Sequence, residues 1–174
     1  VGNTNTRIFP VLDMKKIAVI ILNWNGADLL RKFLPSVCAH TNAHIADVIV
    51  VDNGSDDNSV EVLKQEFPQV KTLLFPQNCG FAAGYNKALE MLDYKYAVLL
   101  NSDVETTPHW LEPLLEFAED NPDVAACQPK IKSLRRREKF EYAGAAGGFI
   151  DRYGYPFCRG RIFNTLETDR GQYD

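Results

Sequence analysis

The chain has 174 residues, 45% of them hydrophobic, and a mean hydropathy of −0.23, which predicts one compact core. No apolar run approaches the roughly 20 residues of a membrane span. With 19 basic and 23 acidic residues the net charge is −4, so nothing suggests wholesale nucleic-acid binding and we expect no nucleic-acid partner.

Four apolar runs that each end in polar residues are predicted to be buried strands. The first thirteen residues are polar and aperiodic, so residues 1–13 are expected to be a flexible N-terminal extension. In chain order, the strand-like runs then cover residues 17–25, 48–55, 70–75 and 98–105. A continuous apolar run of this length is typical of a parallel strand that is covered on both faces.

Apolar residues at helical spacing separate these runs. The first helix is indicated by Leu30, Leu34 and Val37, and the second by residues 60–67. The stripe predicted to face the core in the third helix consists of Ala82, Ala83, Ala88, Leu89 and Leu92. This alternation predicts an α/β fold with a mostly parallel central sheet.

Polar residues at the strand ends are predicted to meet. Crossovers between parallel strands are right-handed, so the carboxyl ends of the strands gather at one edge, where open α/β sheets bind ligands. We therefore expect Asn23, Asp52, Asn78 and Asp103 to line one cleft. Asp103 is the candidate metal ligand; the alternative is that it begins a turn or caps the helix expected after Pro108.

Four motifs in this order carry a resemblance to a known family. They are V-I-I-L-N-W-N-G, V-D-N-G-S-D-D, N-C-G-F-A-A-G-Y-N and L-L-N-S-D-V-E. They resemble family 2 glycosyltransferases of the GT-A fold, particularly the rhamnosyltransferase-like members of bacterial polysaccharide assembly. The resemblance covers residues 15–129 and, more loosely, G-G-F-I-D-R-Y-G-Y-P-F. It implies transfer of a sugar from a nucleoside diphosphate, inversion at the anomeric carbon, and a divalent cation, Mg²⁺ or Mn²⁺, on the diphosphate.

The resemblance also implies contacts to the nucleotide. Asn23 and Trp24 match positions that contact the base, although a Trp there is as often part of the core. We interpret Asp52 as a reader of base or ribose in UDP or dTDP, because a carboxylate accepts the N3–H of uracil or thymine and repels the bare N3 of cytosine. The alternative is that Asp52 closes a turn and caps the next helix, for which Asp56 or Asp57 is better placed.

Further donor contacts are expected at the start of the third helix. Gly80 lies where backbone amides can approach an anion, and Asn78 precedes it. Asn86, about one and a half turns into the helix, reaches the donor or faces solvent. The spacing G-F-A-A-G is neither the dinucleotide fingerprint nor the Walker loop, which argues against a dehydrogenase or a P-loop enzyme. Ser102 is the last of the residues expected to contact the nucleotide donor.

The family's D-x-D motif is reduced here to Asn101, Ser102 and Asp103. One carboxylate with the donor's phosphates and waters can hold Mg²⁺, but only loosely without the donor. No acidic pair after Asp103 matches the one that carries the family's catalytic base, so the base is expected downstream of Asp174.

The composition changes after Pro129. Residues 14–129 are the expected nucleotide-sugar binding core, and residues 130–174 form a basic and then Gly- and aromatic-rich segment that would lead into a missing acceptor half. The basic stretch is interpreted as a solvated loop; the alternative is a patch that meets anionic lipid headgroups or a lipid-diphosphate acceptor. Exposed aromatic residues, and with them self-association or disorder of this segment, are expected at Phe149, Tyr153, Tyr155, Phe157 and Phe163.

Three functions remain from the sequence. The first is an inverting glycosyltransferase that uses a UDP- or dTDP-sugar and a polysaccharide or lipid-linked acceptor. The second is a catalytically silent nucleotide-binding module, and the third is a sugar nucleotidyltransferase, which would need a basic, Gly-rich loop where this chain has N-W-N-G. The scattered cysteines predict reduced thiols and a cytoplasmic protein, which a lipid-binding patch would bring to the inner face of the membrane.

Overall fold

The computed structural model describes residues 15–142 and 146–173, so the expected N-terminal extension over residues 1–13 lies outside the described residues, as does Gly144. The chain divides into two compact units, Val1–His109 and Trp110–Asp174. In the described parts of both units, no helix is long and apolar enough to cross a membrane.

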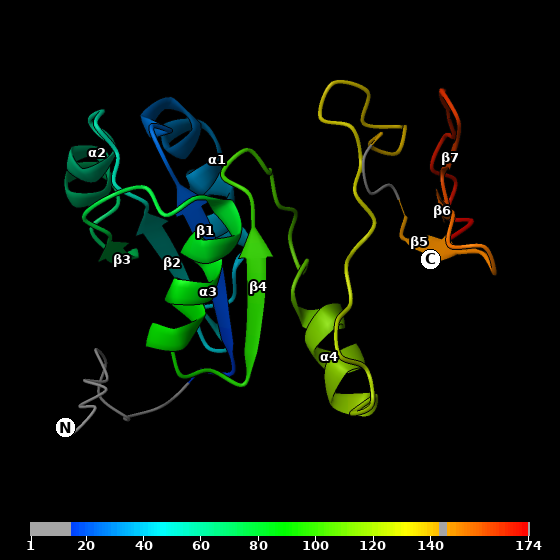
Figure 1. Cartoon of the computed structure of the whole chain (residues 1–174), viewed down its shortest axis with the longest axis horizontal. Coiled ribbons are helices and arrows are strands. Elements are labelled where there is room, and N and C mark those ends of the chain that lie inside the picture. The colour runs from blue at the N-terminus through cyan, green and yellow to red at the C-terminus, as the bar shows by residue number, and fades with distance from the viewer. Residues whose placement is uncertain (1–14, 143–145, 174) are drawn as a thin grey trace. The chain divides into compact units, whose positions relative to one another are not determined.

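The first unit is built on a four-stranded parallel sheet in the order β3-β2-β1-β4 (Figure 1). Its strands are β1 (Ile17–Asn23), β2 (Ala46–Asp52), β3 (Lys71–Leu74) and β4 (Tyr96–Leu100). The predicted parallel α/β sheet is confirmed. The fourth strand begins and ends earlier than predicted, so Asn101, Ser102 and Asp103 fall in the turn that follows it.

Helices cover both faces of this sheet. They are α1 (Ala27–His40), α2 (Ser59–Glu66) and α3 (Phe81–Met91). Figure 1 shows α3 crossing in front of β1, while α1 lies behind it. Successive side chains of a strand point to opposite faces of the sheet, so each strand contributes to the core on both faces. Ile20 and Val51 pack in one cluster with Ala88 of α3. The fully buried Val19 and Val50 point to the opposite face.

The buried face of α3 differs from the predicted one. Gly84, Tyr85 and Ala88 are buried, whereas three residues of the predicted stripe, Ala82, Ala83 and Leu89, are exposed. A Cβ at Gly84 would lie 2.9 Å from Leu22 Cδ2, so glycine allows α3 to approach β1 closely. Tyr85 Oη donates to the Leu100 carbonyl at 3.0 Å. These two contacts fix the rotation of the helix.

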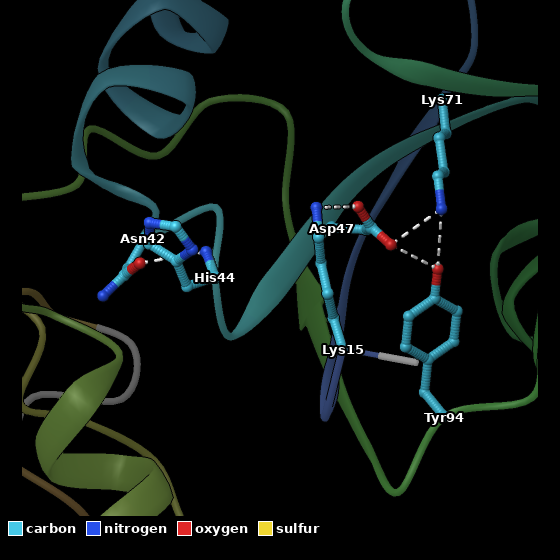
Figure 2. A network of polar contacts seen from close by, with 6 residues as sticks. All are labelled: Lys15, Asn42, His44, Asp47, Lys71 and Tyr94. Atoms are coloured by element: carbon cyan, nitrogen blue, oxygen red, sulfur yellow. Dashed lines mark hydrogen bonds and ion pairs between the residues drawn. The ribbon is translucent and has the colours of Figure 1, made fainter. Parts of the chain in front are cut away.

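At the amino ends of the strands, Asp47 of β2 gathers three donors (Figure 2). Its carboxylate accepts from Lys15 Nζ at 2.6 Å, Lys71 Nζ at 2.7 Å and Tyr94 Oη at 2.8 Å. Burial by itself raises the pKa of Asp47, but hydrogen bonds from these donors outweigh it and hold the pKa below its ordinary value. Lys15 precedes β1, Lys71 begins β3 and Tyr94 precedes β4, so the cluster links the amino ends of all four strands.

The second unit contains one helix, α4 (Glu112–Asp120), and two hairpins within its described residues. The hairpins are β5 (Gly148–Ile150) with β6 (Pro156–Cys158) and β7 (Arg161–Ile162) with β8 (Thr165–Leu166). Its small core surrounds Phe140, which is fully buried and packs with Ala146, Cys158 and Tyr173. Gly160, at φ +84°, makes room for this ring, since a Cβ there would lie 2.7 Å from it.

Some side chains of the basic stretch that begins at Lys130 form ion pairs. Lys130 and Lys132 form ion pairs with Asp169 at 3.2 and 3.1 Å, while Arg135 and Arg136 are exposed. The Gly171 amide first, and then the two ammonium groups, lower the pKa of Asp169 to about 2.

Aromatic side chains are uncovered along the hairpins. The predicted exposure is confirmed for Phe149, Tyr153, Tyr155, Phe157 and Phe163. Phe149 and Phe157 stack across the β5-β6 pair with ring centroids 5.4 Å apart. Exposed apolar surface of this kind is common at contact sites in other proteins.

Candidate functional site

The carboxyl ends of β1 and β2 are joined by side chains. Asn23 lies beside Asp52 in the ladder, and its Nδ2 donates to Asp52 Oδ2 at 3.0 Å. Ser55 donates to the same carboxylate twice, from Oγ to Oδ2 at 2.7 Å and from its amide to Oδ1 at 3.0 Å. Asp52 therefore closes the turn after β2, and since a carboxylate has about four acceptor positions, one remains on Oδ1.

Asn23 is almost completely buried, with 1% of its surface exposed. Its Oδ1 accepts no hydrogen bond from any residue that the structure describes. A Cβ at Gly26 would lie 2.5 Å from this oxygen, so any larger residue at this position in the turn after β1 would displace the Asn23 amide. A buried unpaired acceptor costs about 1–3 kcal/mol, and a ligand that donates a hydrogen bond would stabilise it.

Trp24 follows Asn23 and is 56% exposed, so the alternative that it belongs to the core is wrong. The next residue, Asn25, was not among the predicted site residues. It adopts φ +51°, its amide donates to Ser55 Oγ at 2.9 Å, and its Oδ1 accepts from the Asp56 amide at 2.7 Å. Asn tolerates this backbone conformation better than most residues, and this preference is the signal by which the sequence could have indicated the turn.

Asp57 satisfies the first amides of two helices. Its Oδ2 accepts from Ala27 N at 3.0 Å and its Oδ1 from Ser59 N at 3.0 Å, at the starts of α1 and α2. Burial raises the pKa of Asp57, but these hydrogen bonds outweigh it and lower the pKa below its usual value. The prediction that Asp56 or Asp57, and not Asp52, serves the second helix is confirmed for Asp57.

Asn53 connects the turn after β2 to the loop that leads into α3. Its side chain bonds to Asn78, Cys79 and Gly80 in succession. Asn78 Oδ1 also accepts from the Gly80 amide at 2.7 Å, and Gly80 itself is exposed at φ +81°. The structure thus brings Asn78 and Gly80 next to the residue that follows Asp52, whereas Asn86 is exposed on α3. Asn53 was not among the predicted site residues.

The end of β4 is held on both sides of the predicted metal motif. Tyr85 binds the Leu100 carbonyl before it, and burial raises the pKa of this phenol. After it, Thr106 Oγ1 donates to the Ser36 carbonyl of α1 at 3.0 Å. Between these anchors Asp103 is exposed and Ser102 is half-buried. Because β4 neighbours β1, this turn lies at the same edge of the sheet as Asn23.

The residues at this edge fit a cation that arrives with a ligand. Over residues 15–142 and 146–173, no group of three or more His, Cys, Asp or Glu side chains lies together as a metal site. Asp103 offers one exposed carboxylate. Mg²⁺ is commonly bound through one or two carboxylates together with substrate phosphates and water, so this donor set suits a metal–diphosphate complex better than a free ion.

Sequence comparisons agree with this geometry. The profile of glycosyl transferase family 2 matches residues 18–168. The uncharacterized glycosyltransferase YibD of Escherichia coli (strain K12) is 34% identical over 116 residues, covering 64% of this chain and 33% of YibD. The N-acetylglucosaminyl-diphospho-decaprenol L-rhamnosyltransferase of Mycobacterium tuberculosis (strain ATCC 25618 / H37Rv) is 24% identical over 127 residues, covering 67% of this chain and 41% of the enzyme.

The fold has solved counterparts. The crystal structure of S. aureus TarS 1-349 in complex with UDP-GlcNAc matches with a TM-score of 0.55 and 18% identity, covering 68% of this chain and 38% of that one. At this identity the match shows the fold alone. The chain spans 33% of YibD and 32% of the glycosyltransferase alr2836 of Nostoc sp., about a third of these relatives' length. With 151 consecutive residues matched by the family profile, the chain belongs to glycosyl transferase family 2 and has its GT-A fold.

Proposed function

We propose that this chain binds the nucleotide-sugar donor of an inverting glycosyltransferase that transfers a sugar from a UDP- or dTDP-sugar to a polysaccharide or lipid-linked acceptor. The observation that carries the proposal is the joined carboxyl edge of the sheet, where the ends of β1 and β2 bond to each other and the turn after β2 bonds to the loop after β3. Two relatives support the acceptor class by name: an O-antigen biosynthesis protein of Myxococcus xanthus and the diphospho-decaprenol rhamnosyltransferase.

The nucleoside is proposed to bind at the turns after β1 and β2. Asp52 keeps one acceptor position on Oδ1, which suits the N3–H of uracil or thymine. The exposed indole of Trp24 offers a flat apolar surface for the base. Asn23 holds the Asp52 carboxylate in place and contributes a buried acceptor of its own.

The diphosphate is proposed to lie toward the start of α3 and the turn after β4. The exposed Gly80 brings backbone close to an anion, with Asn78, Asn86 and Ser102 as further polar contacts. Asp103 would hold the Mg²⁺ or Mn²⁺ that accompanies the diphosphate, and this cation would stabilise the negative charge that develops on the leaving group.

Residues 130–173 are proposed to face the acceptor. They contain ten basic and five acidic residues, a net charge of +5, although the whole chain carries −4. The exposed Arg135 and Arg136 and the uncovered aromatic rings suit a lipid diphosphate or anionic headgroups at the inner face of the cytoplasmic membrane. The same aromatic surface accounts for the expected self-association.

A catalytically silent nucleotide-binding module is the second candidate. It is favoured by Asn101, which stands where the family's D-x-D motif has its first carboxylate. The two candidates share the donor site and differ in turnover.

Calorimetry with UDP, dTDP, GDP and CDP, each with and without Mn²⁺, tests the donor site. We expect UDP or dTDP to bind most tightly, with an affinity that falls when EDTA removes the metal. Asp103→Ala should abolish the Mn²⁺-dependent part of this affinity. It should change the free energy of unfolding by no more than about 0.5 kcal/mol, because an exposed carboxylate contributes little to the core.

Glu105→Ala is the matched control, since Glu105 is also exposed and lies two residues further along the chain. This variant should keep the response to Mn²⁺. If EDTA leaves the affinity of the parent chain for every diphosphate unchanged, Asp103 is a turn residue only.

A further inference from the structure

We infer that Asn53 is a positioning residue for the donor site. It fixes the loop of residues 77–80 onto the turn after β2, so that the parts of the site proposed to contact base and diphosphate form one rigid unit. The inference rests on the proposed function, and it concerns a residue that has no proposed contact with the donor.

The side chain of Asn53 forms three hydrogen bonds with this loop. Its Nδ2 donates to Asn78 Oδ1 at 3.0 Å and to the Gly80 carbonyl at 3.2 Å, and its Oδ1 accepts from the Cys79 amide at 3.0 Å. A side-chain amide has two N–H donors, so both are used. Only 2% of the residue is exposed, and water cannot readily replace these bonds.

The backbone of Asn53 is anchored on the other side. Its amide donates to the Asn23 carbonyl at 2.8 Å, at the end of β1. Asn53 therefore connects the end of β1, the end of β2 and the loop before α3. A shift of the loop would break three hydrogen bonds at once and leave buried polar atoms unpaired.

Close packing beside Asn53 supports the same role. Gly54 has φ +73°, and a Cβ there would lie 2.6 Å from the Gln77 Cα and 2.8 Å from the Asn78 amide nitrogen. The turn and the loop are thus in direct backbone contact. The Phe75 amide also donates to the Asp52 carbonyl at 2.8 Å, which extends the β2–β3 pairing up to this loop.

This arrangement has a consequence for binding. A loop that is ordered before the ligand arrives does not lose conformational freedom on binding, and this increases affinity. Uridine would use mainly the turns after β1 and β2, whereas UDP would also use the loop. Loss of the Asn53 side chain should therefore weaken the binding of UDP more than that of uridine.

The test compares UDP with uridine on the whole chain by calorimetry, with Mn²⁺ present. Asn53→Ala should weaken UDP binding about tenfold and leave uridine binding within about twofold, as expected for a lost preorganised loop. Hydrogen exchange without ligand should be faster at the Cys79 amide, whose acceptor is removed. Asn53→Ser should have the same effects as Asn53→Ala, because serine suits turns but is too short to reach the loop. It replaces the alanine variant in the test if that variant does not fold.

Val50→Ala is the control, because Val50 is fully buried in β2, the strand that Asn53 follows, and points to the face opposite to Val51. It should lower stability and leave the ratio of UDP to uridine affinity unchanged. Equal losses for UDP and uridine in the Asn53 variants, or unchanged UDP binding, would overturn the positioning role. If the parent chain binds neither UDP nor uridine, the proposed function itself is wrong and the inference fails with it.

Discussion

At the residue scale, Asp52 has the turn-closing role that was one of its two predicted roles, and its contact with base or ribose stays a proposal. Its carboxylate closes a turn by accepting from Ser55 and is also bound by Asn23. The capping role belongs to Asp57, which serves α1 and α2 together. Since three hydrogen bonds leave one acceptor position on Asp52 Oδ1, the turn does not exclude a contact with a base.

Asp52→Asn should weaken the binding of UDP or dTDP by about 1–3 kcal/mol, because the amide places a donor where the base N3–H also donates. CDP should lose less affinity or gain some, since its N3 is an acceptor. Calorimetry with the three nucleotides measures the difference.

Ser55→Ala is the control for the turn, because it removes the hydroxyl that donates to Asp52 and accepts from the Asn25 amide, and keeps the Asp52 carboxylate. It should affect all pyrimidine nucleotides alike. Equal losses for all of them with Asp52→Asn would show that Asp52 contacts the ribose and not the base.

At the element scale, the two edges of the sheet have different roles. The carboxyl edge carries Asp52, Asp103 and several amides, whereas the amino edge carries the partly buried carboxylate of Asp47 with two lysines and a tyrosine (Figure 2). The amino-edge cluster joins four segments that are distant in sequence. We therefore assign it to the stability of the sheet.

Asp47→Asn should lower the free energy of unfolding at pH 7 by about 1–2 kcal/mol, a figure reduced for the partial exposure of the lysines. Because folding lowers the pKa of Asp47, its stabilising effect is present above the unfolded pKa of about 3.9 and is lost as pH falls through the folded value. The difference between parent and variant should therefore shrink in acid. Urea unfolding at pH 7 and pH 3 measures it.

Lys71 responds at the other end of the pH range. Burial lowers its pKa, but the hydrogen bonds with Asp47 and Tyr94 outweigh burial and raise it, so its contribution is lost only as pH rises above about 10.4. Glu66→Gln is the control for Asp47→Asn, because Glu66 forms an ion pair with Arg31 on the surface. This variant should change the free energy of unfolding by less than about 0.5 kcal/mol. A pH-independent effect of Asp47→Asn would show that charge is not the source.

At the scale of the whole molecule, charge is unevenly distributed. Residues 130–173 carry +5 in a chain of net −4, and the aromatic residues of the hairpins are uncovered. Both features belong to the second unit, whereas the proposed donor contacts all lie in the first. Donor binding and acceptor binding are thus proposed to divide between the two units.

The chain is expected to bind donor without turning it over. Inverting transfer needs a base within about 3 Å of the acceptor hydroxyl, or one water away, and we interpret the acidic residues after Asp103 as lacking the sequence context of the family's base. Assays of donor hydrolysis and of sugar transfer, with an active family member as positive control, measure this. Robust transfer by this chain would contradict this prediction, and the base would then have to be sought among Glu141, Asp151 and Glu167.

The local pattern of the chain was sufficient to predict the parallel sheet, the α/β alternation and the meeting of Asn23 with Asp52. Strand ends are marked by an abrupt change from apolar to polar residues, and right-handed crossovers leave one edge for them. The rotation of α3 was beyond such reasoning. Its alanines suit either face, and the choice depends on Gly84 against Leu22 and on Tyr85 against a carbonyl of β4.

The sequence by itself determined the family, the order of the elements and the residue types at the carboxyl edge, because these depend on periodicity and on short motifs. Only the tertiary structure decided which polar side chains hold the edge together. Asn53 and the loop of residues 77–80 are separated by β3 and α2 along the chain, and Lys15, Asp47 and Tyr94 are further apart still. Contacts of this kind arise from strand pairing and helix packing, which bring distant residues within hydrogen-bonding distance without any local signal.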